Sequence, residues 1–335
     1  MSIDIEILTT VVGKMLETTI TEINYEIKQL HGGTIGNVQL ITGIAKTNNG
    51  DLPYQVVFKT SKKWERYGDL DSWRREYDLY SSELATQFTD GLRWPTCYYA
   101  ELADDEIRLW MEYIDGVTGL DLTPDMYEQA SYELGKFQGK LAFEQSAFLQ
   151  EMTNLSKVDY AKKFYHHYRS WYVVYDYIRA ADCEIPTHLC QMLIDFDNDS
   201  EAIFNRIEKL PVVLCHRDFW ITNIFNTNGK TVLIDWDTTG WGYLGEDLAS
   251  LLADEADVLN MLENYQRCVP AYYQGFSEYQ NVDHITDNCV YELIIALFGY
   301  RLIEWYLGAE TPEEKMLHQE TLEMISKYNL KVGDE

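Results

Sequence analysis

The chain has few basic residues for its length. Its 335 residues include 27 lysines and arginines against 55 aspartates and glutamates, which gives a formal net charge of −28 at pH 7. A surface this acidic repels the phosphates of nucleic acids and the head groups of anionic lipids. We therefore expect neither a nucleic acid nor a membrane as a partner.

Cysteine pairs and long apolar runs are also missing. The six cysteines are scattered, with no Cys-x-x-Cys pair and no cysteine–histidine cluster at zinc spacing, which predicts free thiols in a reducing compartment. The N-terminus lacks the basic start and apolar run of a signal peptide, and the apolar run 293–300 is too short to span a bilayer. These absences predict a cytoplasmic protein and leave its oligomeric state open.

The hydrophobic periodicity predicts a two-lobed α+β protein. With 46% hydrophobic and 14% aromatic residues, the chain can bury a large core, and its length suggests two lobes. Residues 1–114 are typical of antiparallel strands with a helix over residues 1–20 and a second helix after Ser72, whereas residues 115–335 are mainly helical with paired strands near Ile224. The strands predicted in the first lobe cover residues 25–30, 38–45, 54–59, 96–102 and 107–113, with a hairpin turn at Asn48–Asp51.

The stretch that says most about function begins at His216. Asp218, Asn223 and Asp235 lie on two predicted short strands and their turns, so that their side chains can meet at one point. One carboxylate can then orient an attacking hydroxyl, while the other carboxylate and the amide oxygen can hold Mg²⁺ against the phosphates of a nucleotide. The alternative is an acidic surface turn with no chemical role.

Three upstream features fall in the order that nucleotide binding requires. The glycines of 31–38 let backbone N–H groups approach phosphate oxygens, although no Gly-Lys-Ser/Thr follows as in a Walker loop. Lys59 ends an apolar strand and Glu76 lies on the next predicted helix, where the two can form an ion pair beside the phosphates. Taken singly, these features are a tight turn, an exposed lysine and a solvated glutamate. Together with the downstream motif they indicate a nucleotide site.

This order of motifs resembles the aminoglycoside phosphotransferase/choline kinase-like family, over residues 25 to 310. The resemblance implies a protein-kinase-like fold, with an antiparallel-sheet N-terminal lobe and a mainly helical C-terminal lobe. It also implies transfer of the γ-phosphate of ATP (or GTP) to a hydroxyl of a small molecule, with Mg²⁺ as a cofactor.

The resemblance assigns a role to each matching residue. It implies that Asp218 is the catalytic aspartate and that Asn223 and Asp235 bind Mg²⁺. His216 is expected to brace the loop, and Arg217 stands where the family often has glycine. For the nucleotide, the residues implied are Gly32, Gly33, Thr34, Lys59 and Glu76, together with backbone groups of Glu112 and Ile114 in the hinge between the lobes.

Two alternatives to a small-molecule kinase can be weighed from the same residues. The family has an aspartate at the place of Asp247, which we expect to cap the helix that follows. Asp247 comes so soon after Asp235 that the activation segment of a protein kinase has no room, and no Ala-Pro-Glu follows. The second alternative is a non-catalytic nucleotide-binding or scaffold protein. The presence of Lys59, Glu76 and the three downstream residues argues against lost chemistry.

The sequence does not name the acceptor but does suggest its charge. No lysine or arginine occurs between Lys230 and Arg267, while carboxylates are frequent there. A cleft of this charge attracts cations, which predicts a cationic amine, a choline-like compound or an aminoglycoside. The alternative is a solvated acidic helix face. The aromatic residues expected either in the core or in the acceptor wall are Tyr165, Tyr168, Trp171, Tyr172, Tyr175, Trp305 and Tyr306.

Overall fold

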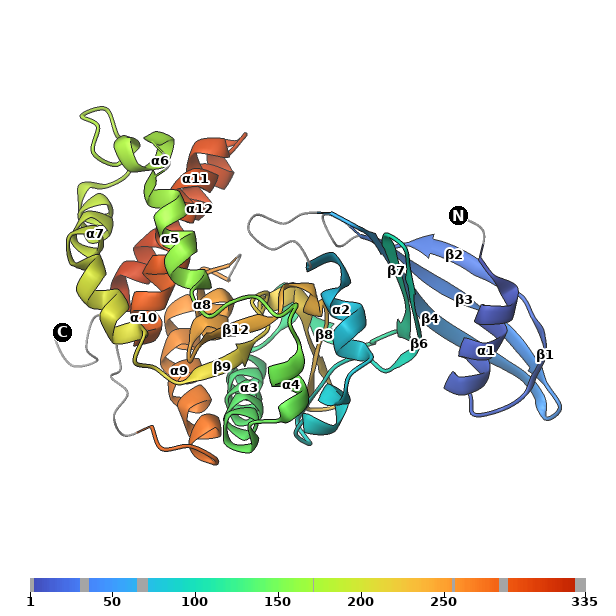
Figure 1. The fold of residues 1–335 in the computed structure, drawn as a ribbon. Coiled ribbons are helices and arrows are strands. Elements are labelled where there is room, and N and C mark those ends of the chain that lie inside the picture. Colours follow the sequence, from blue (N-terminus) through green and yellow to red (C-terminus); the bar gives the residue numbers. More distant parts are fainter. Residues whose placement is uncertain are drawn as a thin grey trace.

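The computed structural model has two lobes that lie side by side (Figure 1), which confirms the predicted α+β fold. Among the residues that it describes, no helix is long and apolar enough to cross a membrane. Gly32, Gly33 and Thr34 lie outside the described residues, as do Trp171 and the side chain of Tyr172. The structure describes residues 3–30, 36–64, 72–170, 172–254, 257–282 and 289–328.

The smaller, N-terminal lobe is built on one antiparallel sheet. Its strands run in the order β1-β3-β4-β7-β6, and β2 also pairs with β3. β3 and β4 form a long hairpin in which Thr47 pairs with Gly50, so the predicted hairpin is confirmed, with Asn48 and Asn49 as its turn residues. All five predicted strands are present, and β1 is an additional one. The bounds are β1 Ile20–Ile23, β2 Glu26–Gln29, β3 Asn37–Thr47, β4 Gly50–Lys62, β6 Cys97–Ala103 and β7 Glu106–Glu112.

Two helices pack against this sheet. Helix α1 (Ile5–Met15) is capped by Asp4 and buries Leu8 in a cluster with sheet residues such as Val56. It ends well before residue 20, because β1 begins there and pairs with β3. Helix α2 (Ser72–Tyr80) lies between the sheet and the larger lobe (Figure 1).

The larger, C-terminal lobe surrounds two small sheets with helices. The sheets have the orders β5-β11-β10-β8 and β12-β9. The strands are β5 Leu92–Arg93, β8 Val117–Thr118, β9 Val212–Cys215, β10 Ile224–Thr227, β11 Lys230–Leu233 and β12 Gly240–Tyr243. The helices are α3 Pro124–Glu144, α4 Ala147–Glu151, α5 Tyr160–Ser170, α6 Tyr172–Tyr177, α7 Thr187–Ile207, α8 Glu246–Ala253, α9 Met261–Ser277, α10 Cys289–Ile294, α11 Tyr300–Gly308 and α12 Pro312–Lys327.

Helices α3 and α9 touch backbone to backbone through glycines. A Cβ at Gly135 would lie 2.1 Å from the carbonyl oxygen of Tyr272, and one at Gly275 would lie 2.0 Å from that of Tyr132. Any larger residue at either glycine would therefore push the two helices apart.

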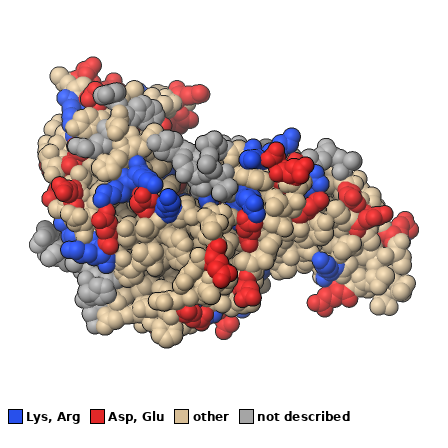
Figure 2. Space-filling model, in the orientation of Figure 1, with Lys and Arg blue, Asp and Glu red and all other residues tan. Residues whose placement is uncertain are grey.

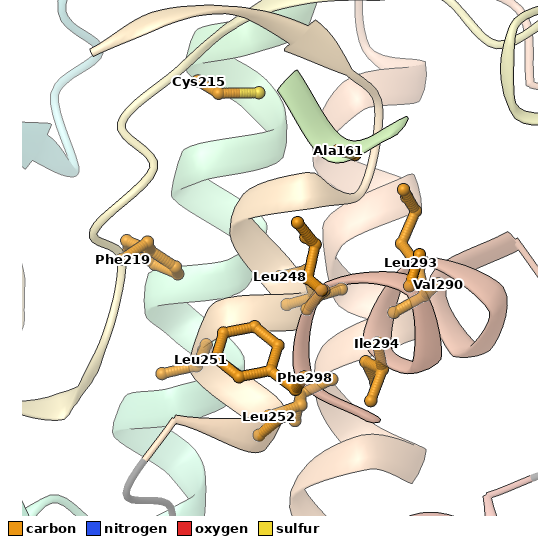
Figure 3. Close-up of a cluster of buried hydrophobic side chains, with 14 of the residues drawn as sticks. Ala161, Cys215, Phe219, Leu248, Leu251, Leu252, Val290, Leu293, Ile294 and Phe298 are labelled. Atoms are coloured by element: carbon orange, nitrogen blue, oxygen red, sulfur yellow. The ribbon is translucent and has the colours of Figure 1, made fainter. Parts of the chain in front are cut away.

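One part of the core of the larger lobe lies around α8. Leu248 of α8 lies beside Val290 and Leu293 of α10, while Leu251 lies on the other side of α8, toward Phe219 from the loop after β9 (Figure 3). The loop that carries the predicted catalytic residues therefore rests directly on a packed apolar cluster.

The segment between α2 and β6 packs with the larger lobe, although it precedes the predicted boundary at Ile114. β5 pairs with β11 in parallel, and Leu92 and Trp94 belong to the core of the larger lobe. Trp94 meets the ring of Trp236 edge to face at 5.6 Å. The division into residues 1–114 and 115–335 stays a prediction.

Candidate active site

Lys59, Glu76 and Asp235 come from three separate elements and meet between the lobes. The Nζ atom of Lys59, on β4, lies 2.6 Å from a carboxylate oxygen of Glu76 on α2 and 2.5 Å from Oδ1 of Asp235, which follows β11. The side chain of Glu76 is almost fully buried, and that of Asp235 is 27% exposed. The predicted lysine–glutamate pair is thus formed, and Asp235 completes it from the other lobe.

Burial and charge act in opposite directions on this group. Burial alone would lower the pKa of Lys59, but the carboxylates of Asp235 and Glu76 outweigh it and raise that pKa. Burial raises the pKa of Glu76 to about 7, against the opposing effect of Lys59. Lys59 therefore stays charged.

Asp218 is held by the loop between β9 and β10. The Nδ2 group of Asn223 donates to Oδ2 of Asp218 at 2.7 Å and to its backbone carbonyl at 2.9 Å. The backbone N–H of Asp218 donates to Nδ1 of His216 at 3.3 Å, and the buried His216 ring meets Trp236 edge to face at 4.7 Å. Burial, followed by repulsion from Asp235, raises the pKa of Asp218 to about 7.

Asn223 and Asp235 are joined through the backbone. The N–H of Ile234 donates to the carbonyl of Asn223 at 3.0 Å, which keeps the two loops side by side. Because the Nδ2 group of Asn223 is turned to Asp218, its Oδ1 atom points away and suits a cation. An amide oxygen and a carboxylate beside phosphates match the preference of Mg²⁺ for a few oxygen ligands. The residues therefore fit a magnesium ion.

Asp247 accepts hydrogen bonds from the loop that leads to Asp218. It is fully buried; its Oδ2 accepts the backbone N–H of His216 at 2.9 Å, and its Oδ1 accepts that of Arg217 at 2.6 Å. Gln138 on α3 donates to the same carboxylate at 2.8 Å. The predicted helix-capping role is wrong, because α8 already begins at Glu246 and the carboxylate is turned to the loop instead.

Arg217 shows why the family often has glycine at this place. Its φ of 66° lies in the left-handed region that favours glycine. Its guanidinium is buried, where it donates to Oγ of Ser156 at 2.5 Å and to the carbonyl of Lys157 at 2.8 Å, and it lies 4.2 Å from the ring of Tyr160. These contacts offset the backbone strain, and the sequence held no sign of them.

In the predicted hinge, both the side chain and the backbone N–H of Glu112 have partners within the protein. The carboxylate of Glu112 accepts two hydrogen bonds from Arg93, at 2.6 and 2.8 Å, and one from the backbone N–H of Thr96. The backbone N–H of Glu112 donates to the carbonyl of Thr96 at 2.8 Å, and the side chain of Ile114 is buried. The Glu112 side chain is therefore turned away from the hinge. Adenine binding there stays a prediction.

A small cavity of about 40 Å³ lies next to Asp218. Its carboxylates are Asp218, Glu246 and Asp254, and its guanidiniums are those of Arg217 and Arg301. The aromatic wall consists of Tyr160, Phe164 and Phe298.

Helix α5 thus lines this cavity, but with other aromatic residues than those singled out from the sequence. Tyr165 and Tyr168 are buried in the core, and the hydroxyl of Tyr165 donates to Asp197 at 2.6 Å. Tyr175 stacks on Arg179 at 3.7 Å. Tyr306 is buried in the same core, whereas Trp305 is only partly buried.

Most carboxylates of the acidic stretch have partners within the protein. Glu246 accepts the backbone N–H of Tyr243 at 2.8 Å, Asp247 accepts two loop amides, and Glu263 pairs with Arg267 at 3.2 Å. On the face drawn in Figure 2, acidic side chains spread over both lobes with basic groups among them. The stretch therefore contributes less free negative charge than its composition suggests.

Comparison with known proteins agrees with this geometry. The phosphotransferase enzyme family APH matches residues 63–279, about two thirds of the chain. No curated protein matches the sequence.

Several solved structures share the fold at low identity. Choline kinase from Cryptosporidium parvum is 16% identical, with a TM-score of 0.58, over 97% of this chain and 95% of the other. An aminoglycoside phosphotransferase from Alicyclobacillus acidocaldarius is 15% identical, with a TM-score of 0.56, over 90% of each chain. An amicoumacin kinase in complex with AMP-PNP and Ca²⁺ is 11% identical, with a TM-score of 0.56, over 98% of this chain and 97% of the other.

Proposed function

The chain belongs to the phosphotransferase enzyme family, and on that premise we propose that it transfers the γ-phosphate of ATP to a hydroxyl group of a small molecule. The observation that carries the proposal is the contact of Lys59 with both Glu76 and Asp235, because it joins the two lobes around a single cation. The similar structures, which include a choline kinase and an aminoglycoside phosphotransferase, support a small acceptor.

In this proposal Asp218 orients the acceptor hydroxyl. One of its oxygens is held by Asn223, so the carboxylate has a fixed direction and the other oxygen can accept the hydroxyl proton. The hydroxyl oxygen forms a bond to the γ-phosphorus as the bond from that phosphorus to the oxygen between the β- and γ-phosphates breaks. That oxygen leaves with ADP. Lys59 neutralises charge on the phosphates, and Glu76 keeps its ammonium in place.

Asn223 and Asp235 would hold Mg²⁺, and the bound ion would supply positive charge against the phosphates. Asp235 has a φ of 64°, in the left-handed region, and such strain at a non-glycine residue is typical of functional positions. The strained backbone turns the carboxylate back toward Lys59 and the phosphate side of the site.

The size of the cavity beside Asp218 supports a small acceptor. One buried water needs about 10–15 Å³ on the same scale, so a volume of about 40 Å³ is small. This size favours a small amino alcohol over an aminoglycoside. An ammonium group on the acceptor is supported by the aromatic wall and by one more carboxylate than guanidinium among the residues that line the cavity.

A panel of hydroxylated small molecules tests the proposal. The purified chain, with ATP or GTP and Mg²⁺, should form nucleoside diphosphate only when an acceptor is added, and the product should carry phosphate on the hydroxyl. The Asp218→Asn variant is the matched control for contaminating kinases.

The same panel separates the alternatives. A chain that binds the nucleotide with Mg²⁺ but forms no diphosphate with any acceptor would be a non-catalytic nucleotide-binding protein. Phosphorylation of a test protein would indicate a protein kinase. Against that reading, residues 236–247 are occupied by a short 3₁₀ turn, β12 and the start of α8, with no long segment between Asp235 and Asp247.

A further inference from the structure

An arginine with unused hydrogen-bond donors lines the cavity beside Asp218. The guanidinium of Arg301, on α11, lies 4.5 Å from the ring of Trp305 and 5.4 Å from that of Phe298. Asp254 is its carboxylate partner, but the N–O distance of 3.9 Å is too long for a hydrogen bond. Within the described part of the chain, no hydrogen bond from this guanidinium is formed, although the group carries five N–H donors.

A wide helical turn brings this arginine to the cavity. Residues Ile295–Gly299 form a π-helical turn between α10 and α11. The turn contributes Leu297 and Phe298 to the cavity wall, and Arg301 follows directly in α11. Turns of this kind are rare in proteins and occur frequently at functional sites, which is an independent indication that this wall binds a ligand.

We propose that the acceptor carries an anionic group, a carboxylate or a phosphate, and that Arg301 binds it while the acceptor hydroxyl lies at Asp218. The inference rests on the proposed function, because both residues line the same small cavity. The rings of Trp305 and Phe298 lie against the guanidinium, whose parallel N–H groups match two oxygens of one anion.

The charged residues that line the cavity also indicate what the rest of the acceptor carries. Asp254 lies beside Arg301, and Glu246 lies beside Arg217, so neither guanidinium leaves a net positive surface. An acceptor with an anionic group alone would bring one negative charge too many next to Asp218. An alcohol that carries both an ammonium and an anionic group, such as a hydroxy amino acid, satisfies Arg301 and the neighbouring carboxylates together.

Matched acceptor pairs test this proposal. Serine and ethanolamine differ only by a carboxylate, as do homoserine and 3-aminopropanol, and glycerol 3-phosphate and glycerol differ only by a phosphate. For wild type we expect the pair member with the preferred anion to have a kcat/KM at least tenfold higher than its partner, since a charge-assisted hydrogen bond is worth about that factor or more. The two amino-alcohol pairs test a carboxylate beside an ammonium group, and the glycerol pair tests a phosphate without an ammonium group.

Variants of Arg301 connect the preference to this residue. Arg301→Met should lower kcat/KM for the acceptor with the anionic group by about 10–100-fold, mainly through KM, and leave kcat/KM for its counterpart without that group little changed. Arg301→Lys keeps the positive charge but lacks the planar guanidinium, so its kcat/KM for the anionic acceptor should lie between those of wild type and Arg301→Met. It also replaces the methionine variant if that variant does not fold. Arg206→Met, which removes an arginine from the surface of α7, is the control for the change in net charge.

Three results would overturn the inference. One is a wild-type preference for the acceptors without an anion. Another is an equal loss of kcat/KM for both members of each acceptor pair in Arg301→Met, which would mean that Arg301 is only structural. The third is a weaker binding of ATP itself in that variant, which would assign Arg301 to the nucleotide. Absence of turnover with every acceptor, by contrast, would count against the proposed phosphotransfer and not specifically against Arg301.

Discussion

The two sides of the candidate site hold their charged groups in different ways. On the phosphate side, Lys59 contacts both Glu76 and Asp235, so the two carboxylates share a single cation. On the acceptor side, Arg217 and Arg301 lie against separate aromatic rings, and each has its own carboxylate nearby. Substitutions should therefore be strongly coupled on the phosphate side and nearly independent on the acceptor side.

Asp218 lies where the two sides meet, and its loss should have the largest effect. Asp218→Asn keeps the size of the side chain and the contact with Asn223, but it cannot orient and deprotonate the hydroxyl. Turnover should fall by about 10²–10⁴-fold with nucleotide binding and thermal stability retained. Single-turnover kinetics on an acceptor found in the panel measure this directly. Near-normal turnover in the variant would mean that another residue takes this role.

Removal of the Asp235 carboxylate should have the next largest effect. Asp235→Ala leaves Lys59 with Glu76 alone and removes one of the two oxygen ligands assigned to Mg²⁺. The dependence of ATP binding on Mg²⁺, measured by calorimetry, should be lost. Asp237→Ala is the matched control two residues away. If this control abolished the dependence and Asp235→Ala did not, the metal ligand would be Asp237.

A double-mutant cycle compares the two sides quantitatively. Lys59→Met and Glu76→Gln should together cost far less than the sum of their separate effects on kcat/KM, with a coupling of about 1–3 kcal/mol. The same cycle with Arg301→Met and Glu246→Gln should give a coupling near zero. Equal coupling energies in the two cycles would mean that the residues of the two sides depend on one another to the same extent.

The smallest expected effect is a pH dependence of stability on the acceptor side. Burial raises the pKa of Glu246 from 4.5 to about 7, with Arg217 acting in the opposite direction. Because the folded-state pKa is raised, the folded protein holds the proton of Glu246 more tightly than the unfolded chain does. Stability is therefore fully present below pH 4.5, where the side chain is neutral in both states, and falls as the pH rises through 7.

The free energy of unfolding of wild type, measured by denaturant titration and taken relative to Glu246→Gln, should therefore fall by on the order of 1–3 kcal/mol between pH 4.5 and 7. Above pH 7 this difference in the free energy of unfolding should be constant. Comparison with the glutamine variant cancels the contribution of Asp247, whose pKa burial also raises, to about 6. A difference that increased with pH would show that Arg217 pairs with Glu246 more strongly than the burial opposes it.

The phosphate side could be predicted from the sequence because its residues stand in fixed order next to strands. Lys59 ends a run of alternating apolar residues, and Asp235 follows another, so each could be placed on its element before the fold was known. The predicted strands of the N-terminal lobe follow from the same periodicity. Strands of two residues such as β5 and β8 have no period of their own, since they form only where a neighbour offers a partner.

The acceptor side could not be predicted in the same way. Arg301, Phe298 and Tyr160 lie far apart in the sequence and come together only when α5 and the π-helical turn pack. The support given by Asp247 is a second example, because an aspartate at a helix start is compatible with capping and also with a contact to a distant loop. Local sequence cannot distinguish these two uses of the carboxylate.

Helix α2 has a consequence for the way in which the whole molecule unfolds. Trp73, near its start, is buried among strand residues of the smaller lobe, whereas Leu79, near its end, belongs to the core of the larger lobe. Between them, the fully buried Arg75 donates to the backbone carbonyls of Asn154 at 2.7 Å and of Asp237 at 2.9 Å.

Neither lobe can therefore melt without exposing part of α2 and leaving the guanidinium of Arg75 without its acceptors. Although the chain has two separate cores, its thermal denaturation should be one cooperative transition.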